Sequence, residues 1–151
     1  MPETVLPAEW APQSGVMLTW PHAQSDWRPY LKEAQESFLD LAQAIATRED
    51  LLIGCFDRGH LEEVRDLLAA ARAPMERIHL HSVPSNDTWT RDHGPITVLR
   101  DGQPVLLDFR FNGWGEKFDA ALDDFITRRL HQAGAFGTTP LEEIELILEG
   151  G

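Results

Sequence analysis

Residues 51–56 read LLIGCF, a short and uninterrupted apolar run, and the segments on either side of this run decide the fold class. An apolar run of this length is typical of a strand that is buried on both faces. Before it, apolar residues between Leu31 and Ile45 recur at helical spacing, and residues 15–20 (GVMLTW) form another apolar run closed by Pro21. The sequence therefore begins with the order strand, helix, strand.

The alternation of helices and strands continues towards the C-terminus. After Phe56 the predicted elements are a helix at 61–71, a strand at 78–83, a turn at 84–87, strands at 96–99 and 105–111, a helix at 122–130 and a strand at 144–148. Asp101 and Gly102 suit a tight hairpin connection, and Asp119 is placed to cap the last helix. Regular alternation with short links predicts an α/β fold.

Composition limits the classes of partner. The 151 residues suffice for one domain, and 42% of them are hydrophobic. A net charge of −12 argues against binding nucleic acid or an anionic membrane, and it is compatible with a cationic small molecule. Without a secretory signal or an apolar run of membrane-spanning length, we expect a cytoplasmic protein, and the single cysteine forms no internal disulfide.

Three segments concentrate residues that can do chemistry. Residues 86–95 (NDTWTRDHGP) place acids, a base, an imidazole and an indole in one loop, and residues 109–117 (FRFNGWGEK) alternate aromatic residues with glycines. The chain ends in EGG, residues 149–151. The alternative is purely structural: the acids cap turns, while Trp89 and Trp114 cover the core.

Taken together, NDTWTRDHGP, FRFNGWGEKFD, LEGG and the opening PAEWAPQSGVMLTWPH resemble the agmatine deiminase and bacterial peptidylarginine deiminase family in identity, order and spacing. The resemblance runs from Pro7 to Gly151, and Phe118 is a departure because relatives often carry Tyr there. It implies a pentein α/β propeller of five ββαβ modules, of which this chain supplies about the first two. Residues 1–151 would be the N-terminal part of a single catalytic domain, truncated at the EGG motif.

The resemblance also implies a mechanism without a cofactor or metal. In such hydrolases a cysteine thiolate attacks the guanidinium carbon, ammonia leaves, and water cleaves the covalent intermediate. By motif, Asp92 is a guanidinium-binding carboxylate, Glu149 is the second acid, and Trp89 and Trp114 line the pocket. The family's catalytic histidine and cysteine would lie beyond residue 151, so we expect this chain to be inactive alone.

The expected substrate is agmatine, converted to N-carbamoylputrescine and ammonia in putrescine and polyamine biosynthesis. Two alternatives stay open: peptidylarginine as the substrate, and a non-catalytic fragment that only binds. Exposed strand edges at a broken propeller ring would favour self-association into a homo-oligomer.

Five other residues could have a functional role. Cys55 lies in an apolar strand, where burial makes a thiol inert. We expect His93 to be solvated or to cap a loop, and Arg91 either pairs with Asp92 or is an exposed charge. His79 and His81 share one strand face and could bind zinc with Asp87 or Asp92, although two partly solvated histidines on a strand edge is the favoured interpretation.

Overall fold

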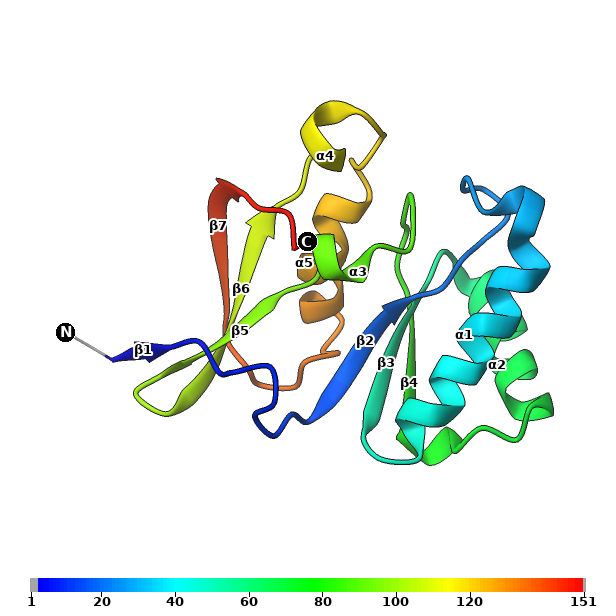
Figure 1. Cartoon of the computed structure of the whole chain (residues 1–151), viewed down its shortest axis with the longest axis horizontal. Coiled ribbons are helices and arrows are strands. Elements are labelled where there is room, and N and C mark those ends of the chain that lie inside the picture. Colours follow the sequence, from blue (N-terminus) through cyan, green and yellow to red (C-terminus); the bar gives the residue numbers. More distant parts are fainter. Residues whose placement is uncertain (1–2, 151) are drawn as a thin grey trace.

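The computed structural model describes residues 3–150, which form two β-sheets with helices packed around them (Figure 1). The order of the principal helices and strands is the one that the sequence predicts. The mixed α/β class is therefore confirmed.

The first sheet is parallel and has the strand order β2-β3-β4. It consists of β2 (Gly15–Thr19), β3 (Asp50–Cys55) and β4 (Ile78–Ser82), connected by α1 (Leu31–Ala46) and α2 (Arg58–Ala70). All five elements were predicted, with ends displaced by no more than one helical turn. Because the strands are parallel, their carboxyl ends meet at one edge of the sheet.

Both faces of this sheet are covered, which explains the uninterrupted apolar run in β3. Leu51, Ile53 and Cys55 are fully buried in the core formed with α1 and α2. Leu52 points to the opposite face and packs with Ile126 and Leu130 in a smaller cluster. Successive strand residues point to opposite faces, so a strand covered on both sides needs apolar residues at every position.

The second sheet has the order β1-β5-β6-β7. Its strands are β1 (Thr4–Val5), β5 (Ile96–Arg100), β6 (Gln103–Arg110) and β7 (Leu141–Ile147). In the hairpin between β5 and β6, Asp101 and Gly102 have φ values of 50° and 78°, the left-handed conformation of a tight hairpin turn. The predicted hairpin is confirmed, whereas β1 was not predicted.

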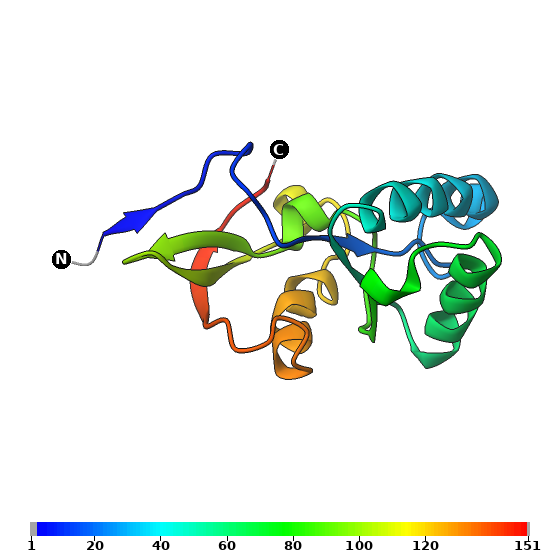
Figure 2. The same ribbon diagram turned by 90° about the horizontal axis from the view of Figure 1, so that it is seen from below.

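Helix α5 (Ile126–Gln132) lies between the two sheets (Figures 1 and 2). Its apolar face packs on the parallel sheet, and Arg128 Nε donates to Asp108 Oδ2 of β6 at 2.7 Å. The prediction that Asp119 caps this helix is wrong. A 3₁₀ turn, η3 (Asp123–Phe125), moves the helix start downstream, and Asp119 Oδ1 instead accepts from Ala121 N at 3.1 Å.

Two one-turn helices, α3 (Thr90–His93) and α4 (Gly113–Glu116), occupy segments that we expected to be loops. Both follow the carboxyl end of a strand, α3 after β4 and α4 after β6. Among residues 3–150, no helix combines the length and the apolar character needed to cross a lipid bilayer.

Candidate functional site

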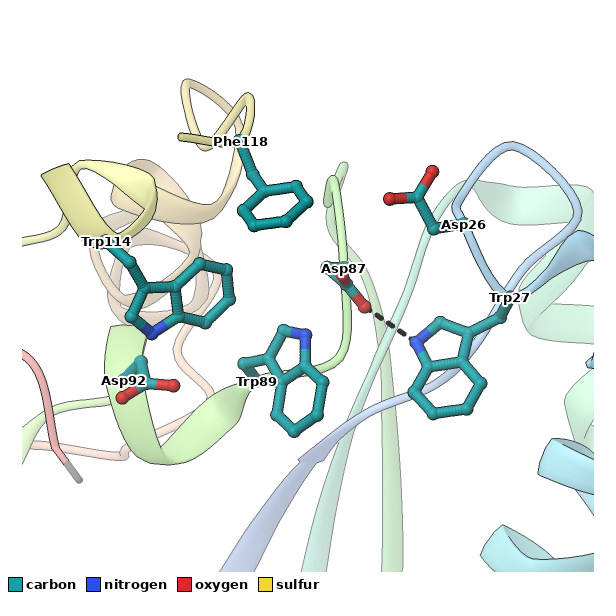
Figure 3. A pocket seen from close by; sticks show the side chains of 7 residues that line it. All are labelled: Asp26, Trp27, Asp87, Trp89, Asp92, Trp114 and Phe118. Carbon is teal, nitrogen blue, oxygen red and sulfur yellow. Dashed lines mark hydrogen bonds between the residues drawn. The ribbon is translucent and has the colours of Figure 1, made fainter. Parts of the chain in front are cut away.

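A cavity of about 510 Å³ opens between the loops that follow the strands, and seven side chains line it (Figure 3). Three of the seven are carboxylates and four are aromatic. The lining residues are Asp26, Trp27, Asp87, Trp89, Asp92, Trp114 and Phe118. A concave aromatic surface with a few charged groups is the usual form of a small-molecule site, and here all the charges are negative.

Both sheets contribute to this cavity. Asp26 and Trp27 follow β2, and Asp87 and Trp89 follow β4, so the parallel sheet places both pairs at its carboxyl edge. Asp92 lies in α3 before β5, while the Trp114 and Phe118 side chains come after β6. Ligand-binding groups commonly gather on loops that a rigid scaffold holds in place.

Asp87 is held by two short hydrogen bonds to one of its oxygens. Trp27 Nε1 and Thr88 N each donate to Asp87 Oδ1 at 2.7 Å, and the first bond is the dashed line in Figure 3. The indole bond links the loop after β2 to the loop after β4. The carboxylate and the Trp27 ring are therefore fixed relative to each other before any ligand binds.

Trp89 is the aromatic residue at the centre of the cavity. Its ring centroid lies 6.2 Å from that of Trp27 and 6.1 Å from that of Trp114, and its exposed fraction is 45%. Phe118 packs edge-on against Trp114 with centroids 5.7 Å apart. Exposed indole faces beside carboxylates favour a flat cation, which gains both cation–π and ionic attraction.

Trp114 has an unusual backbone conformation. Its φ and ψ are 58° and 54°, a left-handed conformation that costs a non-glycine residue on the order of 1–3 kcal/mol. The side chain of Asn112 accepts from Gly115 N at 3.0 Å, which ties the two ends of the turn. At Gly113 a Cβ atom would overlap the carbonyl oxygen of Phe118. The turn thus holds the Trp114 indole in the cavity wall.

The C-terminal segment reaches the Asp92 loop. Gly150 N donates to Asp92 Oδ1 at 3.0 Å, and a Cβ atom at Gly150 would overlap the carbonyl oxygen of Arg91. This close approach requires glycine and brings the backbone of Glu149 beside Asp92. The Glu149 side chain is exposed and is not one of the seven that line the cavity.

The profile of the Porphyromonas-type peptidyl-arginine deiminase family matches residues 5–151. The chain belongs to this family. It is 36% identical over 118 residues to the agmatine deiminase of Pseudomonas syringae pv. syringae, covering 78% of this chain and 30% of that protein. With the agmatine deiminase of Ectopseudomonas mendocina it shares 35% identity over 132 residues, covering 83% and 34%.

A solved structure of a family member has the same fold. The substrate-bound variant of the C. jejuni agmatine deiminase superposes with a TM-score of 0.87 at 30% identity, covering 99% of this chain and 42% of that one. The family resemblance predicted from the motifs is thus confirmed. The chain spans less than half the length of these relatives.

For two motif residues, the structure contradicts the expected solvation of His93 and, of the two alternatives for Arg91, favours the exposed charge. His93 is only 3% exposed, and its Nε2 lies 3.5 Å from Thr19 Oγ1, so the expected solvated position is wrong. Burial lowers the His93 pKa to about 4, which keeps the ring neutral. Arg91 forms no ion pair with Asp92 among the described residues; its guanidinium is exposed, 3.4 Å from the Gly150 carbonyl and 3.9 Å from Glu9 Oε1.

The only cysteine of the chain is not in the site. Cys55 is fully buried in the core of the parallel sheet, as predicted, and burial raises the pKa of its thiol to about 12. A thiol with such a pKa is not a thiolate near neutral pH. Cys55 therefore lacks the ionisation and the access that a nucleophilic thiol needs.

The histidine pair on β4 lies outside the cavity. His79 Nε2 is 3.8 Å from Asp50 Oδ1 on the neighbouring strand, and both side chains are more than half exposed. Asp87 and Asp92, considered above as further zinc ligands, line the cavity instead. Within residues 3–150 no group of three or more His, Cys, Asp or Glu side chains is arranged to hold a metal ion.

Sequence reasoning placed Asp92, Trp89 and Trp114 in one site, and the structure brings these three side chains to one cavity. It assigned no pocket role to Asp26 or Asp87. The sequence did carry a signal for both acids, because Asp26 adjoins Trp27 and Asp87 lies within the NDTWTRDHGP motif. What the sequence does not reveal is that the two loops, 60 positions apart at Trp27 and Asp87, are joined by a hydrogen bond.

Proposed function

We propose that this chain supplies the substrate-binding part of an agmatine deiminase-like hydrolase, which converts agmatine to N-carbamoylputrescine and ammonia in a cytoplasmic putrescine-forming route. The observation that carries the proposal is the cavity in which three carboxylates and four aromatic rings converge. Membership of the deiminase family supports a guanidino group as the ligand that this cavity recognises.

Each site residue then has a role. Asp92 would pair with the planar N–H groups of the guanidinium by charge-assisted hydrogen bonds. Glu149, whose backbone lies beside Asp92, would provide the second acid once its exposed side chain turns towards the cavity. Trp89 and Trp114, whose rings stand at 84° to each other, would line two sides of the cation, with one indole over its flat face. Because Gly150 N donates to Asp92 Oδ1, this carboxylate is already oriented before the ligand arrives.

The positive charges of the two candidate substrates, compared with the carboxylates of the cavity, favour agmatine over peptidylarginine. Agmatine carries an ammonium at the end opposite its guanidinium, whereas an arginine residue within a peptide carries only the guanidinium. Asp26 and Asp87 line the same cavity as Asp92, so a second positive charge finds carboxylates there. Peptidylarginine remains the second candidate because the matching family includes deiminases of that kind.

We further propose that the nucleophile comes from outside residues 1–151. Cys55 is the only cysteine here, and it is buried. The catalytic thiol and histidine would be contributed by later modules of a five-module pentein propeller, with this chain forming about the first two. The chain alone would then bind the substrate cation without hydrolysing it.

Calorimetric titration with agmatine tests the binding role. We expect Asp92→Asn to weaken the affinity at least about tenfold, since a charge-assisted hydrogen bond contributes roughly 1.5–3 kcal/mol. Asp119→Asn is the matched control, because Asp119 is an exposed acid that accepts a hydrogen bond from Ala121 N and does not line the cavity. Equal affinities for the wild type and Asp92→Asn would refute the role of Asp92.

An assay for ammonia and ureido product separates binding from catalysis. We expect the 151-residue chain to bind agmatine without forming product, because it contributes no ionisable thiol to the cavity. Product release by this chain at the rate of a complete deiminase would show that the nucleophile is among residues 1–151.

A further inference from the structure

Two consecutive buried acids lie behind the cavity without lining it. Asp123 and Asp124 belong to η3, and their exposed fractions are 2% and 6%. Burying two adjacent carboxylates is costly unless both are fully hydrogen-bonded. Their partners therefore show what these residues hold in place.

Asp123 holds the loop that follows β4. Its Oδ1 accepts from the backbone N–H groups of Asn86, at 2.7 Å, and Asp87, at 3.3 Å. In return, Asn86 Oδ1 accepts from Leu122 N at 2.8 Å and from Asp123 N at 3.2 Å. These four reciprocal bonds fix the segment immediately before the cavity side chains of Asp87 and Trp89.

Asp124 holds the end of β6. Its Oδ1 accepts from Phe111 N at 2.7 Å, and its Oδ2 accepts from Arg110 Nε at 2.8 Å. Residues 112–118 follow directly and contribute Trp114 and Phe118 to the cavity. The Phe111 ring also packs edge-on against Trp114, with centroids 5.1 Å apart, so a fixed Phe111 backbone fixes this wall.

We propose that Asp123 and Asp124 are positioning residues that set the separation of the two cavity walls, one carboxylate holding each wall. The proposal rests on the function proposed above, because it concerns the same cation site. Consecutive Cα atoms are held about 3.8 Å apart across a trans peptide. The two walls are therefore tied to neighbouring points of the chain, and this keeps the Trp89 and Trp114 rings in edge-to-face contact, with their centroids 6.1 Å apart.

Substitution of each acid tests the proposal, with agmatine as the probe. Asp123→Leu removes the acceptor, whereas Asp123→Asn keeps an oxygen for the same two N–H groups. We expect Asp123→Leu to weaken agmatine binding at least about tenfold in folded protein and Asp123→Asn to retain affinity within about threefold, as the loss or retention of buried hydrogen bonds implies. If Asp123→Leu does not fold, Asn86→Ala takes its place. It removes the two hydrogen bonds that Asn86 Oδ1 accepts, and we expect it to weaken agmatine binding.

Leu130→Ala is the matched control, because Leu130 is equally buried on α5 but contacts the parallel sheet instead of a cavity wall. We expect this variant to be less stable and to bind agmatine as the wild type does when folded. Loss of affinity in Leu130→Ala equal to that in Asp123→Leu would overturn the proposal. Wild-type affinity in a folded Asp123→Leu protein would also overturn it.

The indole N–H resonances separate failure of this proposal from failure of the proposed function, because they are measured without ligand. Trp27 and Trp114 each report on one wall, whereas Trp89 contacts both rings. Asp123→Leu should shift the Trp27 resonance more than that of Trp114, and Asp124→Leu should shift the Trp114 resonance more than that of Trp27. Equal shifts of Trp27 and Trp114 in both variants, or no shift in either variant, would contradict separate control of the walls even if agmatine binds.

Discussion

The parallel sheet and the region around η3 are held together in different ways. In the core of the sheet and its helices, Leu51 and Ile53 of β3 and Val64 of α2 are fully buried and pack through apolar contacts that have no required direction. Around η3, Asp123 and Asp124 each hold a wall through hydrogen bonds to particular atoms. Apolar packing gives the molecule its stability, whereas directional bonds determine where the binding side chains lie.

The largest expected effect is on the apolar region. Ile53→Ala should lower the free energy of unfolding by roughly 2–5 kcal/mol, because it leaves a cavity in a fully buried site. Urea denaturation measures this change. If the apolar core and the η3 region are separable, the folded fraction of Ile53→Ala should bind agmatine with wild-type affinity. A loss of affinity together with the loss of stability would show that the two regions do not act separately.

The second prediction concerns pH and His93. The folded pKa, about 4, is below the ordinary value of 6.5, so the neutral ring is favoured and its stabilising contribution is complete above pH 6.5. That contribution should be lost as the pH falls from 6.5 to 4, by about 3 kcal/mol.

The difference between the wild type and His93→Gln in urea denaturation at several pH values isolates this contribution. The subtraction is needed because burial raises the Asp123 pKa to about 6, which acts in the opposite direction over part of that range. If His93→Gln shows the same pH dependence as the wild type, His93 is not the group responsible.

The third prediction exchanges one side chain of the cavity. Trp89→Leu should weaken agmatine binding about tenfold, because a cation over an indole gains roughly 0.5–2 kcal/mol. Stability should change little, since the Trp89 side chain is 45% exposed. Trp10→Leu is the control, because Trp10 is 89% exposed and outside the cavity. Calorimetry measures the affinity and thermal denaturation the stability of both variants. Equal agmatine affinities of Trp89→Leu and Trp10→Leu would show that Trp89 does not stack on the cation.

The smallest expected effect is at Phe118, the position at which the sequence departs from the family motif to which it was compared. Phe118→Tyr adds a hydroxyl to an exposed ring that packs edge-on against Trp114. We expect stability to change by less than about 0.5 kcal/mol and agmatine affinity by less than about threefold. A larger change in calorimetric affinity would mean that this position contacts the ligand directly.

The same contrast explains which features the sequence could predict. Helices α1 and α2 followed from helical periodicity and the parallel strands from short apolar runs, because apolar burial leaves both patterns in the sequence. The two-residue strand β1 and the one-turn helices are too short to show a period. His93 was expected to be solvated or to cap a loop, and its position beside Asp92 in the sequence does not show that the ring turns towards Thr19.

The candidate site was predictable to a similar extent. Motif resemblance selected Asp92, Trp89 and Trp114, which do share a cavity, and Glu149, whose backbone approaches Asp92 while its side chain stays exposed. No feature of the sequence identified Asp123 and Asp124 as positioning residues. Asp123 meets the backbone of Asn86 from 37 positions away, and no local pattern reports such a pairing.

The central claim is that a guanidinium cation binds between Trp27, Trp89 and Trp114, and the five indole N–H resonances of ¹⁵N-labelled protein test it most directly. During titration with agmatine, these three should shift together with one affinity, while buried Trp20 and exposed Trp10 stay unchanged. Asp92→Asn should require a much higher agmatine concentration for the same shifts. Unmoved resonances of Trp27, Trp89 and Trp114 at high agmatine concentration would contradict the claim.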